Sequence, residues 1–199
     1  RPNGIAVAVP FDADELAVTG PESPVLEGIA IGANGTANLT VSSDGSLIYR
    51  SGNSQPSQRP VRPVRVTRSG QATDIDSAWS YTPGFNGGLS LSPDASRLAV
   101  TIHGDPVGDI WIKELDRGPL SRVTFDNSIK YRPIWMPDGE SVSYVIEDGQ
   151  ASAILRRRVD GGGTVDTVIT STHTIAEAAW SGDGSWLAYR VTMPSRDIY

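Results

Sequence analysis

The chain has no cysteine among its 199 residues, which excludes disulfide bonds and cysteine-bound metals. Metal motifs are also absent. The two histidines are not four residues apart and no Asp-x-Asp-x-Asp-Gly loop occurs, so we expect no metal and no cofactor. No apolar run approaches the roughly 20 residues that a membrane-spanning helix needs. Acidic residues outnumber lysine and arginine by 23 to 17, a net charge of −6, which argues against nucleic acid as a partner.

Helical periodicity is missing as well, because apolar residues nowhere keep a 3.6-residue period over three turns. In its place, 21 glycines and 14 prolines separate short runs of β-branched and aromatic residues. This composition is typical of an all-β domain with many turns, and we expect residues 1–199 to form one such domain. The chain starts at Arg1 and stops at Tyr199 inside an expected strand, so we expect it to be part of a longer protein.

One short turn centred on an aspartate recurs four times, at intervals of 50, 44 and 45 residues. An apolar residue stands three positions before each aspartate, and an apolar strand follows it, with the first copy one residue shorter there. Proline fixes φ, and the aspartate side chain can bond the backbone that follows, so each copy is expected to be a turn between two strands. The four copies are Ser43-Asp44-Gly45, Pro93-Asp94-Ala95, Pro137-Asp138-Gly139 and Gly182-Asp183-Gly184.

A third and a fourth strand follow each of the first three turns, for example Asp109–Leu115 and Leu120–Phe125 after the second copy. Four strands repeating every 44 to 50 residues are the sequence signature of a β-propeller blade. We therefore predict a β-propeller of four-stranded antiparallel blades, about four in number, that is open or is closed by shared termini or a second copy. The expected units are outer strands at about 1–28, complete blades at about 37–75, 88–125 and 131–171, and a partial blade at 176–199.

The repeat resembles the TolB-type, WD40-like propeller repeat, whose core is roughly aromatic-Ser-Pro-Asp-Gly followed by a hydrophobic strand. Pro133–Gly139 and Ala179–Gly184 match this core well. Single positions depart from this core: Ala95 stands at the glycine position, and Ser43 and Gly182 stand at the proline position. The resemblance implies a propeller fold over nearly the whole chain, but it is much less specific for function.

Two further stretches, Gly4–Asp12 and Gly104–Trp111, resemble propellers fused behind bacterial serine/threonine protein kinases, although no kinase motif is present. These resemblances imply a non-catalytic binding or sensing module of a larger bacterial protein. Its partner would be a protein, a peptide or a small polar ligand. A sensor or TolB-like domain would lie outside the cytoplasm.

The resemblance also implies which face binds partners. Loops between second and third strands share a face with the links between blades, around the central channel. The ligand-binding candidates on this face are His103, Asp105, Tyr131, Arg132, His173 and Glu177, and their neighbours are Asp109, Lys130 and Arg190. The alternative is that these are solvated loop residues and turn-holding aspartates. Asp109 and Asp197 recur at equivalent positions, which favours a structural role for both.

A serine hydrolase, or the accessory propeller of one, is the alternative function. A catalytic triad needs a serine within hydrogen-bond reach of a histidine, and the candidates are Ser90, His103 and His173. No Gly-x-Ser-x-Gly elbow is present. The segment nearest to one, Gly88–Ser92, lacks the second glycine. If the chain is an enzyme, we expect it to act on esters.

Three other patterns have structural explanations. Asp160–Gly163 lacks the Lys-Ser/Thr and the helix of a phosphate loop, so a hairpin turn is expected. Arg156–Arg158 is expected to pair with nearby carboxylates. Aromatic residues at equivalent repeat positions, such as Trp135, Tyr144 and Trp180, are expected to pack between blades. An open arc would leave unpaired strand edges, so we also predict self-association into a homo-oligomer.

Overall fold

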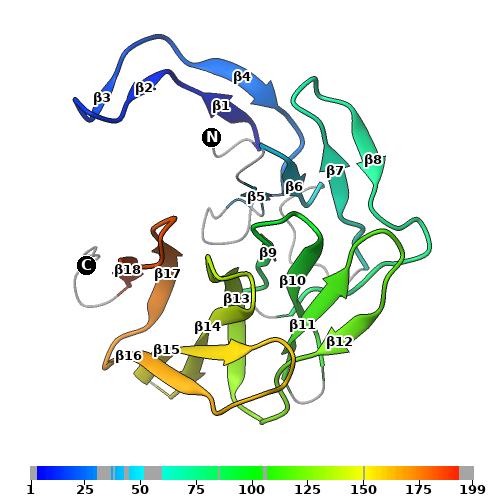
Figure 1. Ribbon diagram of the computed structural model, residues 1–199, viewed down its shortest axis with the longest axis vertical. Helices are drawn as coiled ribbons and strands as arrows, with labels where there is room; N and C mark the ends of the chain where they lie inside the picture. The colour runs from blue at the N-terminus through cyan, green and yellow to red at the C-terminus, as the bar shows by residue number, and fades with distance from the viewer. Residues whose placement is uncertain are drawn as a thin grey trace.

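The computed structural model describes residues 4–30, 37, 39–42, 45–51, 60–84, 86–104, 107–149 and 151–192. Their regular structure consists only of β-strands (Figure 1), and they contain no helix that could cross a membrane. The strands are β1 (Ala6–Ala8), β2 (Phe11–Asp12), β3 (Ala17–Val18), β4 (Ser23–Leu26), β5 (Leu39–Val41), β6 (Leu47–Tyr49), β7 (Val64–Val66), β8 (Ala72–Asp74), β9 (Leu89–Leu91), β10 (Arg97–Ile102), β11 (Asp109–Glu114), β12 (Leu120–Arg122), β13 (Ile129–Trp135), β14 (Ser141–Asp148), β15 (Ala151–Arg158), β16 (Asp166–Ser171), β17 (Ile175–Trp180) and β18 (Leu187–Val191).

Three antiparallel sheets of four strands form the body of the molecule, and in each the strands pair in chain order. We call them blade 1 (β5–β8), blade 2 (β9–β12) and blade 3 (β13–β16). The pair β17–β18 continues the series as half-blade 4. Figure 1 shows the sheets following one another around an arc. The predicted all-β fold with four-stranded antiparallel blades is thus confirmed. That residues 1–199 form one domain stays a prediction.

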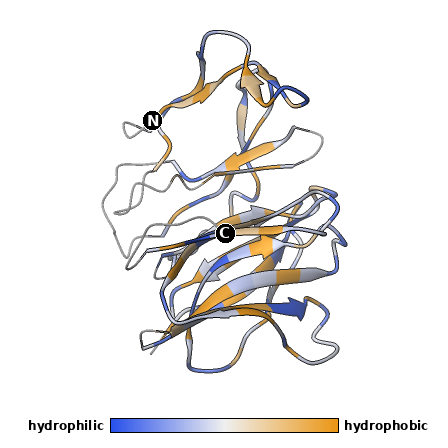
Figure 2. Ribbon diagram, turned by 90° about the vertical axis from the view of Figure 1, so that its left-hand side faces the viewer, coloured by the Kyte–Doolittle hydropathy of each residue, from blue (hydrophilic) through white to orange (hydrophobic). Residues whose placement is uncertain are grey.

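The ribbon formed by β1 and β4 lies beyond blade 1 (Figures 1 and 2), and its residues Ala6 and Leu26 pack against the cluster that contains Tyr49 and Val66 of blade 1. Its two strands pair in register at Ala8 and Ser23, as expected for the outer strands of a blade. Between them lies a hairpin, β2–β3, that the repeat did not predict. The ribbon and half-blade 4 are separate two-stranded sheets, so the described residues do not close a ring by sharing a blade.

In every blade the recurring aspartate turn is closed by a backbone hydrogen bond from the residue after the aspartate to the carbonyl three positions earlier. In blades 2, 3 and 4 the residue two positions before the aspartate donates its N–H to the carbonyl five residues later, at 2.8–2.9 Å. In blade 1 the corresponding bond spans four residues, from Ser42 to Ser46, as the shorter first copy requires. The Asp94 carboxylate accepts bonds from the Ser92 and Ser96 hydroxyls and the Ser96 N–H. Asp183 is bonded in the same way.

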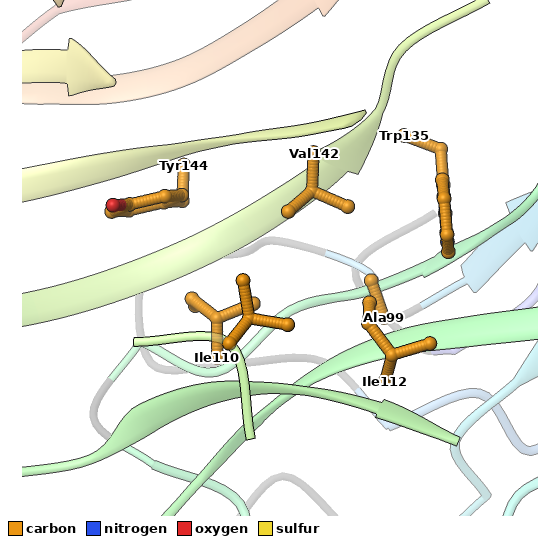
Figure 3. Packing of buried hydrophobic residues seen from close by; sticks show 7 residues of the cluster. Ala99, Ile110, Ile112, Trp135, Val142 and Tyr144 are labelled. Carbon is orange, nitrogen blue, oxygen red and sulfur yellow. The ribbon is translucent and has the colours of Figure 1, made fainter. Parts of the chain in front are cut away.

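The hydrophobic core is divided among the spaces between neighbouring sheets. Figure 3 shows the largest of these clusters, where Trp135, Val142 and Tyr144 of blade 3 face blade 2. Their neighbours on blade 2 are Ala99, Ile110 and Ile112. The aromatic residues at equivalent repeat positions therefore pack between blades and do not form a ligand box. Burying each large side chain contributes about 2 kcal/mol.

The glycine-rich and arginine-rich segments also have the expected structural roles. Asp160–Gly163 lies in the hairpin between β15 and β16, where Asp160 Oδ1 accepts the Gly162 N–H at 2.8 Å. Arg156 pairs with Asp166 at 2.7 Å, and Arg158 pairs with Glu140 and Asp160 at 2.7 and 2.8 Å. Arg157 instead lies over the ring of Phe125 at 5.8 Å.

Candidate functional site

The first strands of the blades begin at one end of the molecule, and a groove lies against them. Antiparallel pairing places the end of each second strand beside the start of the first, as in the pairs Ile129–Glu147 and Ile175–Val191. The groove has a volume of about 370 Å³. Its walls come from β5, β9, β13 and β17 and include Leu39, Gly88, Leu89, Arg132, Ile134 and Glu177.

Two strand irregularities line up across the groove. The β13–β14 register shifts between Tyr131 and Ile134, and the β17–β18 register shifts between Ile175 and Glu177. Arg132 lies in the first of these bulges with a φ of +54°, a value that residues other than glycine seldom adopt. A bulge changes the direction of the side chains at that point, so each irregularity places a charged residue in the groove wall.

Gly88 allows the neighbouring blade to approach this bulge. A Cβ at Gly88 would lie 3.0 Å from the Cα of Arg132, closer than real side chains normally come. The backbone of blade 2 therefore rests directly against the strained residue of blade 3. Any larger residue at this position would push the two groove walls apart.

Arg132 and Glu177 in the groove wall form a chain of ion pairs with Arg190 of β18. Arg132 Nη1 lies 3.3 Å from Glu177 Oε1, and Arg190 Nε lies 3.2 Å from Glu177 Oε2. Burial lowers the pKa of the Arg132 guanidinium from its ordinary value, and the Glu177 carboxylate acts in the opposite direction. One carboxylate thus bridges two guanidinium groups, and the cluster keeps a net charge of +1.

The structure distributes the predicted ligand-binding residues unevenly. Arg132 and Glu177 meet in the groove. His103 is exposed beyond β10, His173 is half-buried before β17, and neither belongs to the groove wall. Tyr131 is 1 % exposed and donates its hydroxyl to the carbonyl of Ile175 at 3.2 Å, so it belongs to the core and presents no surface to a ligand. Asp105 lies outside the described residues.

Ser90, the candidate nucleophile, lies at the contact between blades 2 and 3. Its Oγ accepts the backbone N–H of Trp135 at 3.1 Å. Among the described residues, no hydrogen bond joins Ser90 to His103 or His173. The Nδ1 of His173 instead lies 3.2 Å from the Thr172 hydroxyl. Because a triad needs the serine beside a base, this arrangement offers no support for hydrolysis.

Asp109 and Lys130 form a second charged cluster, which clamps blade 2 to blade 3. Asp109 accepts bonds from Arg122 and from the Thr124 hydroxyl at 2.7 Å. The buried Lys130 ammonium lies 3.5 Å from Asp109 and 2.9 Å from Asp126, and donates to the Asp126 carbonyl at 2.6 Å. Burial opposes ionisation of Asp126, but bonds from Ser128 and Lys130 outweigh it and lower the pKa of Asp126 to about 2. These saturated contacts indicate a structural cluster.

The comparisons with known proteins agree with this architecture. Residues 40–196 match the family model described as the TolB beta propeller domain. The chain belongs to the TolB β-propeller family. Among curated proteins, no match was found. The resemblance to kinase-linked propellers and the location outside the cytoplasm stay predictions.

Solved structures of TolB proteins are similar to this family member in fold. TolB from Acinetobacter baumannii matches with a TM-score of 0.65 at 15 % identity, covering 92 % of this chain and 42 % of that one. A putative TolB from Agrobacterium tumefaciens matches with a TM-score of 0.70 at 19 % identity, covering 96 % of this chain and 64 % of that one. A chain of a nidogen/laminin complex matches with a TM-score of 0.70 at 12 % identity, covering 95 % of this chain and 67 % of that one. The chain spans less than two thirds of the length of either TolB protein.

Sequence reasoning missed how the site of this TolB-family chain is assembled. The sequence predicted that nine residues share one face. It did not distinguish the residues that line the groove from those that are buried in the core or that belong to the Asp109–Lys130 cluster. The adjacent residues Tyr131 and Arg132 show the difficulty, since one is buried and the other lines the groove. The bulge that follows Tyr131 has no signal in the sequence. Among the described residues, no group of three or more histidine, aspartate or glutamate residues could hold a metal.

Proposed function

We propose that this chain is a non-catalytic interaction module that binds a segment of another protein, or a peptide, in the groove beside Arg132 and Glu177. The supporting observation is that the first strands of all four blades contribute to one groove with both apolar and charged walls. Its volume of about 370 Å³ suits a few side chains of an extended segment. Its charged groups can orient a ligand, while Ser90, the one nucleophile candidate, is held in the contact between blades.

Peptide binding in the groove can be tested by filling the groove with a large side chain. Peptides that bind the purified chain would be selected from a displayed library of random sequences, and their affinities measured by isothermal titration calorimetry. Ala37 is exposed and lines the groove, so Ala37→Trp would fill it without disturbing the core. We expect this variant to weaken binding of the selected peptides at least about tenfold.

Ala72→Trp provides the matched control, because Ala72 is exposed on β8 and lies outside the groove wall. This variant should bind the selected peptides like the parent chain. Retention of full affinity by Ala37→Trp would overturn the proposal. Equal losses in both variants would overturn it as well, because they would place the binding surface elsewhere.

The proposal includes self-association through the two open ends of the arc. On the second strands of blades 2 and 3, a small residue faces the next blade: Ala99 and Ser143 are both fully buried there. The equivalent residue of half-blade 4, Ala188, is exposed, and Trp186 beside it is 77 % exposed. This face therefore has the surface of a contact between blades, but none of the blades that the structure describes lies against it.

Blade 1 has the complementary feature on the part of its surface that the ribbon of β1 and β4 leaves open. Val41 of blade 1 is 55 % exposed, whereas its repeat equivalents Leu91 and Trp135 are buried against the preceding blade. We infer that a second copy places its Val41 face against the Ala188 face, as successive blades already do within the chain. Two such contacts related by a two-fold axis would close a ring.

Size-exclusion chromatography with light scattering tests this inference. The parent chain should elute with twice the monomer mass, and Ala188→Arg should shift it to the monomer. Ala72→Arg introduces the same charge on an outer strand and should remain a dimer. A parent chain that is monomeric at all concentrations would overturn self-association without affecting the peptide groove.

A further inference from the structure

Two guanidinium groups meet at Glu177, that of Arg132 in the groove wall and that of Arg190 behind it on β18, and they have far more hydrogen-bond donors than acceptor partners. Each arginine carries five N–H donors, but the contacts with Glu177 engage only Nη1 of Arg132 and Nε of Arg190. In the part of the chain that the structure describes, neither guanidinium contacts any other acceptor. The Arg132 side chain is 16 % exposed, and none of its nitrogens is among the fully buried atoms without a partner. Its free donors are therefore accessible to a ligand in the groove.

The backbone at Arg132 supports the same conclusion. A positive φ at a residue other than glycine is unfavourable and persists where the surroundings impose it, frequently at binding sites. Here the strain places Arg132 in the groove, and the bulge on β17 places Glu177 opposite. The pair Arg132–Glu177 joins blade 3 to half-blade 4, but the hydrogen bond from Trp180 to Ser143 also joins these two sheets, so the ion pair is not their only contact.

We propose that Arg132 and Arg190 form a subsite for a carboxylate, taken from an acidic side chain of the bound peptide. A carboxylate offers two coplanar oxygens, which match the fork of a guanidinium group. The cluster has a net charge of +1, which one carboxylate neutralises and a phosphate dianion would exceed. Leu89 and Ile134 line the same groove and provide apolar surface for flanking side chains. This inference rests on the proposed function of the groove.

Glu177 has a definite role in this arrangement. Its carboxylate holds the two guanidinium groups in place through one oxygen each, and it is 45 % exposed. It therefore orients the subsite and at the same time competes with the incoming carboxylate for donors. Removing its charge should strengthen carboxylate binding, whereas removing either arginine should abolish it.

The test compares two peptides that differ only in charge, acetyl-Leu-Glu-Leu-amide and acetyl-Leu-Gln-Leu-amide, titrated into the ¹⁵N-labelled chain and followed by NMR. The glutamate peptide should bind about tenfold more tightly than the glutamine peptide, and should shift the amide signals of Gly88 and Leu89. Arg132→Gln or Arg190→Gln should remove this preference, and Arg132→Lys should restore only part of it. Glu177→Gln should raise the affinity for the glutamate peptide several-fold.

Arg156→Gln is the matched control, because Arg156 pairs with Asp166 on the outer strands, and it should leave the preference unchanged. Equal binding of both peptides in the groove would overturn the carboxylate subsite while leaving the proposed function standing. A preference that survives Arg132→Gln would overturn it too, as would the absence of binding by either peptide. Tighter binding of inorganic phosphate than of acetate would reassign the subsite to phosphate groups.

Discussion

Arg97 of blade 2 lies over the indole of Trp135 in blade 3, with its guanidinium carbon 4.6 Å from the ring centroid. The same side chain donates through Nη2 to the carbonyl of Gly139, in the aspartate turn of blade 3, at 2.5 Å. One residue therefore fixes both the core and the turn of the neighbouring sheet. It shows that contacts between blades, as well as pairing within them, set the order of the arc.

Arg97→Met should lower the free energy of unfolding by about 1–2 kcal/mol, because it removes a cation–π contact and a charged hydrogen bond but keeps the apolar stem. Urea denaturation followed by circular dichroism measures the change. Arg62→Met is the control, because the pair of Arg62 with Asp74 is exposed and 3.9 Å long, and it should change stability by less than about 0.5 kcal/mol. If both variants lowered the free energy of unfolding equally, the contact of Arg97 with blade 3 would contribute nothing specific to stability.

Trp180→Ala should be the more damaging of two tryptophan substitutions in half-blade 4. Trp180 donates its indole N–H to the Ser143 hydroxyl of blade 3 at 2.9 Å, and its loss should cost about 3 kcal/mol. Trp186 is exposed, so Trp186→Ala in dilute solution should stay within about 0.5 kcal/mol of the parent chain. Thermal unfolding of both variants measures this, and a near-zero shift for Trp180→Ala would show that Trp180 is not part of the core.

Ala95→Gly should stabilise the chain. Ala95 has a φ of +57°, whereas the equivalent positions Gly45, Gly139 and Gly184 have φ values of +65° to +82°. Glycine removes the clash of Cβ in this region, and we expect a gain of about 0.5–1 kcal/mol in the free energy of unfolding. The control Ala99→Gly, in a buried strand position, should instead destabilise the chain. A loss of stability in Ala95→Gly would mean that methyl packing outweighs backbone strain.

Lys130→Met should lower the free energy of unfolding by about 3–5 kcal/mol, because it leaves buried oxygens without their cation. The groups affected are the Asp109 carboxylate and the carbonyls of Asp126 and Ser128, to which the ammonium lies at 2.6–3.5 Å. Arg158→Met breaks exposed ion pairs and should cost at most about 1 kcal/mol. Urea denaturation measures the loss of unfolding free energy in both variants. Similar losses would argue against a buried clamp at Lys130.

Acid should weaken the turns through their aspartates. Hydrogen bonds from Ser92 and Ser96 lower the pKa of Asp94 from 3.8 to about 2. Because the folded chain favours the ionised form, this contribution is fully present above about pH 4 and is lost as the pH falls toward 2. Asp94→Asn cannot titrate, so its stability should fall less between pH 4 and pH 2 in urea denaturation experiments. An unchanged pH dependence in this variant would contradict the assignment.

The sequence by itself determined the blades, because each aspartate turn is held by contacts within about five residues. Asp94 and Asp183 bond residues two positions away, so a local pattern predicts the turn, the strands beside it and the repeat. The alternation of apolar residues then predicts which faces pack between sheets. The β2–β3 hairpin has no repeat equivalent and could not be predicted in this way.

Only the tertiary structure decided the site. Arg132 and Glu177 are far apart in the chain, and they meet because their strands start at the same end of adjacent blades. Tyr131 and Arg132 point to opposite faces as neighbours in a strand do, one into the core and one into the groove, and a bulge follows Tyr131 where the register with β14 shifts. Such a bulge depends on how closely Gly88 of the neighbouring sheet approaches, and that distance arises only when separate repeats pack together.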